Sequence, residues 1–159
     1  MKYPFFYHIF CKGQVYFFGL KMIERYHIDF LMALLLVLPV IFIMDILGIK
    51  DFHIHGINSY SFLLLVILSP VCEEVIFRIG LQNFILSKNN KRLGFISYAN
   101  IITALTFCLF HTINQSFLWS LAVFVPALVF GYFYEKKRSV WAPIGLHVFY
   151  NAIFFTMLF

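Results

Sequence analysis

Long runs of apolar residues, separated by short polar segments, fill most of this chain. A helix that crosses a membrane needs about 20 mostly apolar residues. The pattern predicts five such spans, at about 30–49, 62–86, 95–113, 117–134 and 140–159. The polar segments between them are too short to separate two domains. Several aromatic residues near the predicted span ends, among them Tyr60, Trp119 and Trp141, are expected at the membrane interfaces.

The first 29 residues have a different pattern, in which aromatic side chains alternate with Lys12, Lys21 and Arg25. This mixture is typical of an amphipathic segment that lies along the membrane surface. We therefore divide the chain into an N-terminal cytoplasmic or interfacial segment, 1–29, and a transmembrane bundle, 30–159. The predicted fold class is all-α, a polytopic transmembrane helical bundle.

Composition and charge agree with a membrane protein. Of the 159 residues, 62% are hydrophobic and 12% are charged, whereas soluble domains have about 45–50% apolar and about 25% charged residues. All but Lys50 and Arg78 of the 12 Lys and Arg residues fall in the N-terminal segment or in every second loop. The positive-inside rule then places the N-terminus in the cytoplasm and the C-terminus outside. The net charge of +5 therefore reflects topology, and we expect no nucleic-acid partner.

Ionisable residues inside the second span are the first candidates for chemistry. A charged side chain within a span costs about 2.5–3.5 kcal/mol on insertion scales, so it is a functional hypothesis by default. At 100° per residue, Glu74, Arg78 and Gln82 share one stripe, which predicts an ion pair between Glu74 and Arg78. Glu73 lies about 100° away, on a stripe with Ser69, and can face a cavity.

Two other spans carry polar groups that can join Glu73. His111 lies on a small and polar face of the third span, and His147 and Asn151 lie four residues apart in the fifth. A carboxylate and an imidazole can hold a water molecule and take its proton. A second imidazole and an amide can donate hydrogen bonds to an oxyanion. This set favours hydrolysis of an amide by activated water, although the same residues could only hold the bundle together.

The predicted topology sets a condition on such a site. His111 is placed near the outer end of the third span, whereas His147 is nearer the cytoplasmic end of the fifth. A shared site therefore requires strongly tilted helices or shifted span ends.

Three motifs in this order resemble those of the CPBP family of intramembrane endopeptidases, the CAAX proteases and bacteriocin-processing enzymes that are also called Abi. The motifs are Glu73-Glu74-x-x-x-Arg78, Phe107-x-x-x-His111 and His147-x-x-x-Asn151. They cover about residues 70–151. The resemblance implies an intramembrane endopeptidase of the glutamate type. It also implies a substrate that is a membrane-embedded or lipidated peptide or protein, in CAAX-like processing, in bacteriocin or signal peptide maturation, or in self-immunity.

The resemblance also implies a role for each matching residue. Glu73 would be the base that activates water, and His111 would assist it. His147 and Asn151 would form the oxyanion site. The supporting residues would be Glu74 and Arg78, which would maintain the geometry.

Several alternatives stay open at the level of sequence. Glu73, His111 and His147 could hold Zn²⁺ and leave a fourth position for water, but the chain has no HExxH motif, so we expect no cofactor. A non-catalytic peptide-binding immunity protein would use the same pocket without cleavage. A small proton-coupled transporter would use the ionisable residues as a relay, although no inverted repeat is visible. Frequent Phe, Ile, Lys and Asn residues suggest a low-GC bacterium, and therefore a bacterial cell membrane.

Overall fold

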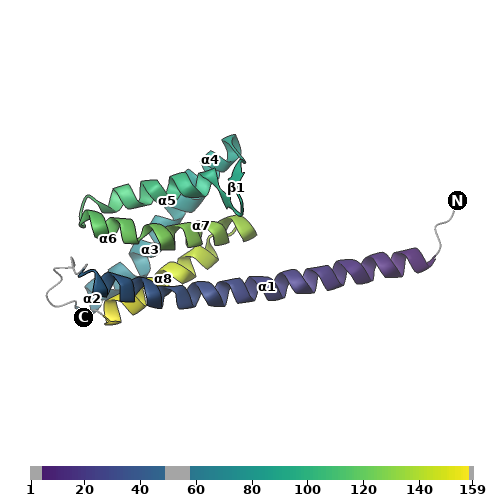
Figure 1. The fold of residues 1–159 in the computed structure, drawn as a ribbon, viewed down its shortest axis with the longest axis horizontal. Helices are drawn as coiled ribbons and strands as arrows, with labels where there is room; N and C mark the ends of the chain where they lie inside the picture. Colours follow the sequence, from purple (N-terminus) through teal and green to yellow (C-terminus); the bar gives the residue numbers. More distant parts are fainter. Residues whose placement is uncertain (1–4, 49–57, 158–159) are drawn as a thin grey trace. The chain divides into compact units, whose positions relative to one another are not determined.

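The computed structural model describes residues 5–48 and 58–157, with side chains from residue 25 onward. Within these ranges the chain is helical apart from one short hairpin and the connecting turns (Figure 1). The chain forms two compact units, residues 1–35 and 36–159. All the side chains of the site described below belong to the second unit.

The first helix, α1, runs from Phe5 to Ile46. Its part from Arg25 to Ile46 is 22 residues long and apolar enough to cross a membrane, which agrees with the predicted first span. The helix continues through residues 29 and 30, so no structural break marks the proposed boundary between the N-terminal segment and the bundle. The interfacial position of residues 1–29 stays a prediction.

The predicted second span is a helical rod that runs without interruption from Ser59 to Lys88. It consists of α2 (Ser59–Leu63), a π-helical segment η1 (Leu64–Leu68), α3 (Ser69–Glu74), a second π-helical segment η2 (Val75–Gln82), and α4 (Asn83–Lys88). The Asn58 side chain caps its start by accepting a hydrogen bond from the Ser61 N–H at 2.8 Å. π-Helical turns are rare and are often found at functional sites.

A small antiparallel hairpin follows this rod. Strands β1 (Arg92–Leu93) and β2 (Ile96–Ser97) pair across a turn in which Gly94 has a φ of +61°. The sequence pattern placed the start of the third span inside this hairpin. Helix α5 instead runs from Tyr98 to His111, with its first turn capped by Ser97. Its 14 residues make it shorter than the predicted span.

The last two predicted spans are helical. Helices α6 (Phe117–Ala122) and α7 (Phe124–Lys137) are separated by one residue, and together they form a second apolar stretch long enough to span a membrane. Helix α8 runs from Trp141 to Met157. By length and composition, two helices among the described residues qualify as membrane spans, so the count of five spans stays a prediction.

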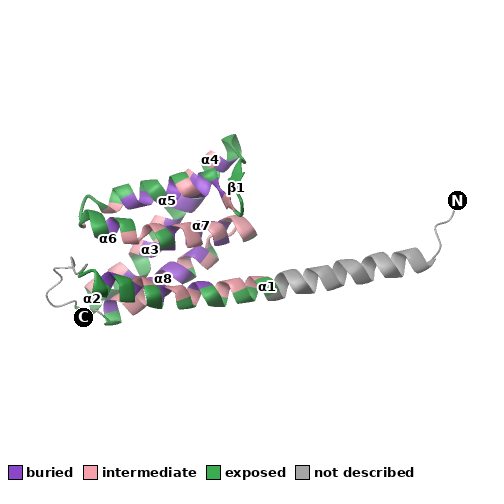
Figure 2. Cartoon of the chain, in the orientation of Figure 1, coloured by how far each residue is buried: buried purple, intermediate pink, exposed green. Residues whose placement is uncertain are grey.

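The bundle is formed by the Ser59–Lys88 rod and helices α5, α7 and α8, which pack against one another. Its interior contains polar side chains that are fully buried, including Glu74, Arg78 and Gln82. Its outer faces carry large apolar side chains, such as Leu109 and Phe110 on α5. Figure 2 shows exposed positions in green along α5, α6 and α8. This arrangement suits a bundle surrounded by lipid, because only the exterior then contacts an apolar medium.

Candidate active site

A buried ion pair lies at the centre of the bundle. The Arg78 Nε donates to Glu74 Oε2 at 2.7 Å, and both side chains are 0% exposed. This confirms the pair predicted from their spacing of four residues. The guanidinium group also donates from Nη1 to Gln82 Oε1 at 3.0 Å and from Nη2 to the Ala127 carbonyl at 3.1 Å. A buried charge needs this degree of pairing. Removal of one partner of a buried ion pair lowers the free energy of unfolding by about 3–5 kcal/mol.

His147 from α8 contacts the same glutamate. Its Nδ1 lies 2.9 Å from Glu74 Oε1, and because a carboxylate accepts, we assign Nδ1 as the donor. The imidazole stacks on Phe130 with a centroid distance of 5.0 Å, and the edge of Phe107 lies 5.9 Å away. The other ring nitrogen, Nε2, lies 3.7 Å from Glu73 Oε2. This separation is longer than a hydrogen bond.

Glu73 has an environment quite different from that of its neighbour. Its side chain is 22% exposed, whereas that of Glu74 is 0% exposed. Its Oε1 accepts a hydrogen bond from the Ser69 hydroxyl at 2.6 Å, one helical turn earlier in the chain. The 100° offset between adjacent residues thus separates two carboxylates: one is buried and paired, and the other borders a pocket.

His111 is the last residue of α5. Its Nδ1 lies 2.9 Å from the Phe107 carbonyl oxygen. Since a carbonyl only accepts, Nδ1 is the donor, and Nε2 is the acceptor nitrogen of the neutral ring. The imidazole is held between Phe107, at 4.3 Å between centroids, and Trp119, on which it stacks at 5.5 Å.

Asn151 donates from Nδ2 to the Leu65 carbonyl at 3.0 Å. The π-helical geometry explains why this carbonyl needs a side-chain partner. The Ser69 N–H bonds to the Leu64 carbonyl, five residues back. In the same register, the Leu65 carbonyl would accept from the backbone nitrogen of residue 70, but this residue is a proline and has no N–H. The Asn151 amide is the donor for this carbonyl instead.

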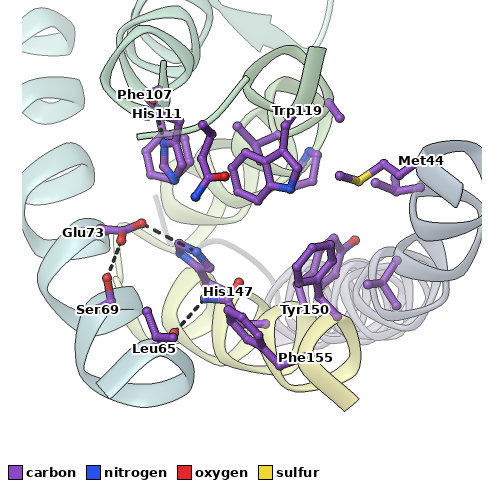
Figure 3. A pocket seen from close by; sticks show the side chains of 18 of the residues that line it. Met44, Leu65, Ser69, Glu73, Phe107, His111, Trp119, His147, Tyr150 and Phe155 are labelled. Atoms are coloured by element: carbon purple, nitrogen blue, oxygen red, sulfur yellow. Dashed lines mark hydrogen bonds and ion pairs between the residues drawn. The ribbon is translucent and has the colours of Figure 1, made fainter. Parts of the chain in front are cut away.

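The four predicted catalytic residues line one pocket of about 330 Å³, part of which is drawn in Figure 3. Glu73, His111, His147 and Asn151 come from three separate helical segments, and all four border this cavity. Helix α5 also begins at Tyr98, later than the predicted start near residue 95, which is a shift of the kind that the predicted topology required for a shared site. Phe107 links the two imidazoles, since its ring contacts both.

Apolar side chains make up most of the remaining wall. The C-terminal part of α1 contributes Val37, Val40, Ile41 and Met44, which no motif in the sequence indicated. Trp119 also lines the pocket and is 9% exposed. Its assignment to an interfacial belt was wrong, because its ring packs on His111 rather than facing outward.

A metal site needs several ligating side chains that converge on one point. Within residues 25–48 and 58–157, no three His, Cys, Asp or Glu side chains converge as a metal site requires. The Nδ1 atoms of both histidines donate to Glu74 and to a backbone carbonyl, as the second ring nitrogen of a metal-bound histidine also does, so Nε2 would be the ligand atom of each ring if a metal bound. The Zn²⁺ alternative stays a hypothesis, and the steps proposed below need no metal.

No curated protein and no solved structure matches this chain. The model of the type II CAAX prenyl endopeptidase Rce1-like family matches residues 56–153. This range is more than half of the chain and includes every residue of the three motifs. The chain therefore belongs to the Rce1-like family of type II CAAX prenyl endopeptidases, which are membrane-embedded proteases.

Proposed function

We propose that this protein is an intramembrane endopeptidase that hydrolyses a peptide bond through water activated by Glu73. The supporting observation is the contrast between two adjacent carboxylates. Glu74 is buried and paired, whereas Glu73 borders a pocket that it shares with His111, His147 and Asn151. Among the described residues, Glu73 has no Lys or Arg ion-pair partner, and a carboxylate of this kind beside two imidazoles is suited to act as a general base.

In the proposed reaction, Glu73 takes a proton from a water molecule while the water oxygen attacks the carbonyl carbon of the scissile bond. The acceptor Nε2 of His111 orients this water through its second proton. The new carbon–oxygen bond places a negative charge on the former carbonyl oxygen. The proton held by Glu73 then passes to the departing nitrogen as the carbon–nitrogen bond breaks.

His147 and Asn151 are proposed to stabilise the oxyanion. Because His147 Nδ1 faces Glu74, its Nε2 can donate to an oxyanion only when both ring nitrogens carry protons. The Asn151 amide has two N–H groups, and the one not engaged by the Leu65 carbonyl is available for the substrate. Glu74 and Arg78 act as supporting residues that hold the His147 ring in place.

The pocket also supports a proposal for the substrate. Its largely apolar wall, including Val37, Met44 and Phe154, suits the apolar part of a membrane-embedded or lipidated peptide. We propose CAAX-like processing, bacteriocin or signal peptide maturation, or self-immunity as the biological setting. The proposed location is a bacterial cell membrane, with the N-terminus cytoplasmic and the C-terminus external.

The test is a cleavage assay on the purified full-length chain in lipid vesicles. A farnesylated CAAX peptide with a fluorophore and quencher flanking the prenylated cysteine is the probe. We expect the wild type to cleave it, Glu73→Ala and His111→Ala to lose cleavage, and a chelator to have no effect. Loss of activity in chelator would overturn the metal-free scheme. Cleavage by Glu73→Ala at the wild-type rate would overturn the role of Glu73.

A further inference from the structure

A second group of buried polar side chains lies beyond the pocket, around Gln82. This side chain is 0% exposed. Its Oε1 accepts from Arg78 Nη1 at 3.0 Å, and its Nε2 donates to the Gly131 carbonyl at 3.1 Å and to Glu135 Oε1 at 2.9 Å. Both N–H groups and the oxygen are thus engaged, which fixes the orientation of the amide.

Glu135, near the end of α7, connects this group to the hairpin. Its side chain is 6% exposed, and its Oε1 also accepts from the Ser97 hydroxyl on β2. Its Oε2 forms an ion pair with Arg92 on β1 at 3.0 Å. Arg92 is 47% exposed, so this connection ends at the surface.

These contacts form one continuous chain of hydrogen bonds that starts at His147. His147 donates to Glu74, Arg78 donates to Glu74 and to Gln82, and Gln82 donates to Glu135. Every link is between 2.7 and 3.0 Å long. Three of the members lie four residues apart on one stripe of the rod, so the chain runs along its length.

Close packing leaves this chain little freedom. A Cβ atom placed on Gly131 would lie 1.9 Å from Asn100 Oδ1 and 2.9 Å from Gln82 Oε1. The helix α7 backbone therefore lies directly against the two amides, and Gln82 has little space in which to move. A hydrogen-bonded side chain held in this way transmits its position to its partners.

We infer that Gln82 is a positioning residue: through Arg78 and Glu74 it fixes the orientation of His147. This inference rests on the oxyanion role proposed for His147. Gln82 does not line the pocket, so it contacts neither substrate nor water there. Its replacement should lower kcat and leave KM unchanged. A small displacement of a group at the reacting centre can reduce the rate by about 100-fold, so we expect a loss of about 10- to 100-fold.

The test uses a set of variants that distinguish a changed orientation of His147 from a general loss of protein stability. Gln82→Leu removes both donor and acceptor. Gln82→Glu keeps an acceptor for Arg78 but brings a second carboxylate against Glu135. Adding Glu135→Gln to Gln82→Glu restores a donor–acceptor pair between the two positions, so it should recover activity. The matched control is Asn83→Ala, which removes an exposed amide from the adjacent position.

Two readouts are measured on the full-length protein in detergent micelles. The first is the imidazole ¹⁵N chemical shifts of His147, assigned with His147→Gln. The second is kcat and KM on the farnesylated peptide, together with thermal unfolding to select variants that are folded. We expect the His147 shifts to move in Gln82→Leu and Gln82→Glu, to return in the double variant, and to stay unchanged in Asn83→Ala.

The outcomes distinguish this inference from the proposed function. If the wild type cleaves no peptide but the His147 shifts follow the predicted pattern, the coupling is supported and the proposed proteolysis fails. If the folded Gln82→Leu or Gln82→Glu protein has wild-type His147 shifts and wild-type kcat, the inference is overturned. A double variant that recovers neither shift nor kcat also overturns it.

Discussion

Replacing Arg78 by methionine should strongly destabilise the protein, because it leaves a buried carboxylate without its cation. Arg78 and Glu74 are both 0% exposed, and the guanidinium donates three hydrogen bonds of 2.7 to 3.1 Å. Removal of one partner of a buried pair costs about 3–5 kcal/mol. Glu74 would keep only its contact with His147. We therefore expect Arg78→Met to lower the free energy of unfolding by about 3–5 kcal/mol.

The double variant Glu74→Leu/Arg78→Met tests the physical reason. Replacement of a whole buried pair by apolar residues is often neutral. Here His147 would also lose its acceptor, which costs about 1–3 kcal/mol. The double variant should therefore be more stable than Arg78→Met alone, by about 2 kcal/mol from the difference of these ranges.

Reversible unfolding in mixed micelles, followed by circular dichroism as the mole fraction of SDS increases, measures these differences. Arg25→Met is the matched control, because Arg25 is exposed. Surface changes of this kind stay within about 0.5 kcal/mol. A loss below about 1 kcal/mol in Arg78→Met would show that the buried carboxylate is not left unpaired, since this loss is smaller than the cost of one unsatisfied buried group. A double variant no more stable than the single variant would show the same.

Two further predictions concern the packing around the site and the orientation of the base. Gly131→Ala should destabilise the bundle, because the added Cβ would lie 1.9 Å from Asn100 Oδ1. Gly145→Ala should stabilise α8 by about 0.5–1 kcal/mol, because no heavy atom lies within 4 Å of the added Cβ. The same unfolding titration measures both variants, and equal effects would contradict the close approach at Gly131. Ser69→Ala removes the 2.6 Å hydrogen bond to Glu73 and should lower kcat on the farnesylated peptide by about 10-fold. Ser69→Thr keeps the hydroxyl and should retain most of the activity, so equal rates for the two variants would exclude an orienting role.

Local periodicity predicted the parts of the site that lie on one helix. The spacing of Glu74, Arg78 and Gln82 predicted that these side chains share one face of the helix, where they are buried. The offset of Glu73 predicted that its carboxylate faces a cavity, and it lines the pocket. The placement of His147 four residues before Asn151 likewise put both at the same cavity. These predictions succeeded because the angle between residues on a helix depends on the backbone alone.

Contacts between distant segments were not predictable in the same way. Glu135 is 53 residues from Gln82, and a helical pattern shows which face is polar but not what packs against it. Trp119 is apolar at a span end, a position that suits an interface as well as a pocket wall. The hairpin around Gly94 was missed because each strand has only two residues, too few for an alternating pattern to appear.

We propose that Glu73 performs the chemistry rather than holding the bundle or binding a peptide. The most direct measurement compares Glu73→Gln with Asp45→Asn, a matched amide substitution at an exposed position outside the pocket. Both cleavage and binding of the farnesylated peptide are followed on the folded, vesicle-reconstituted proteins. We expect Glu73→Gln to bind the peptide with wild-type affinity but not to cleave it, and Asp45→Asn to do both. Cleavage by Glu73→Gln at the wild-type rate would show that Glu73 is not the base.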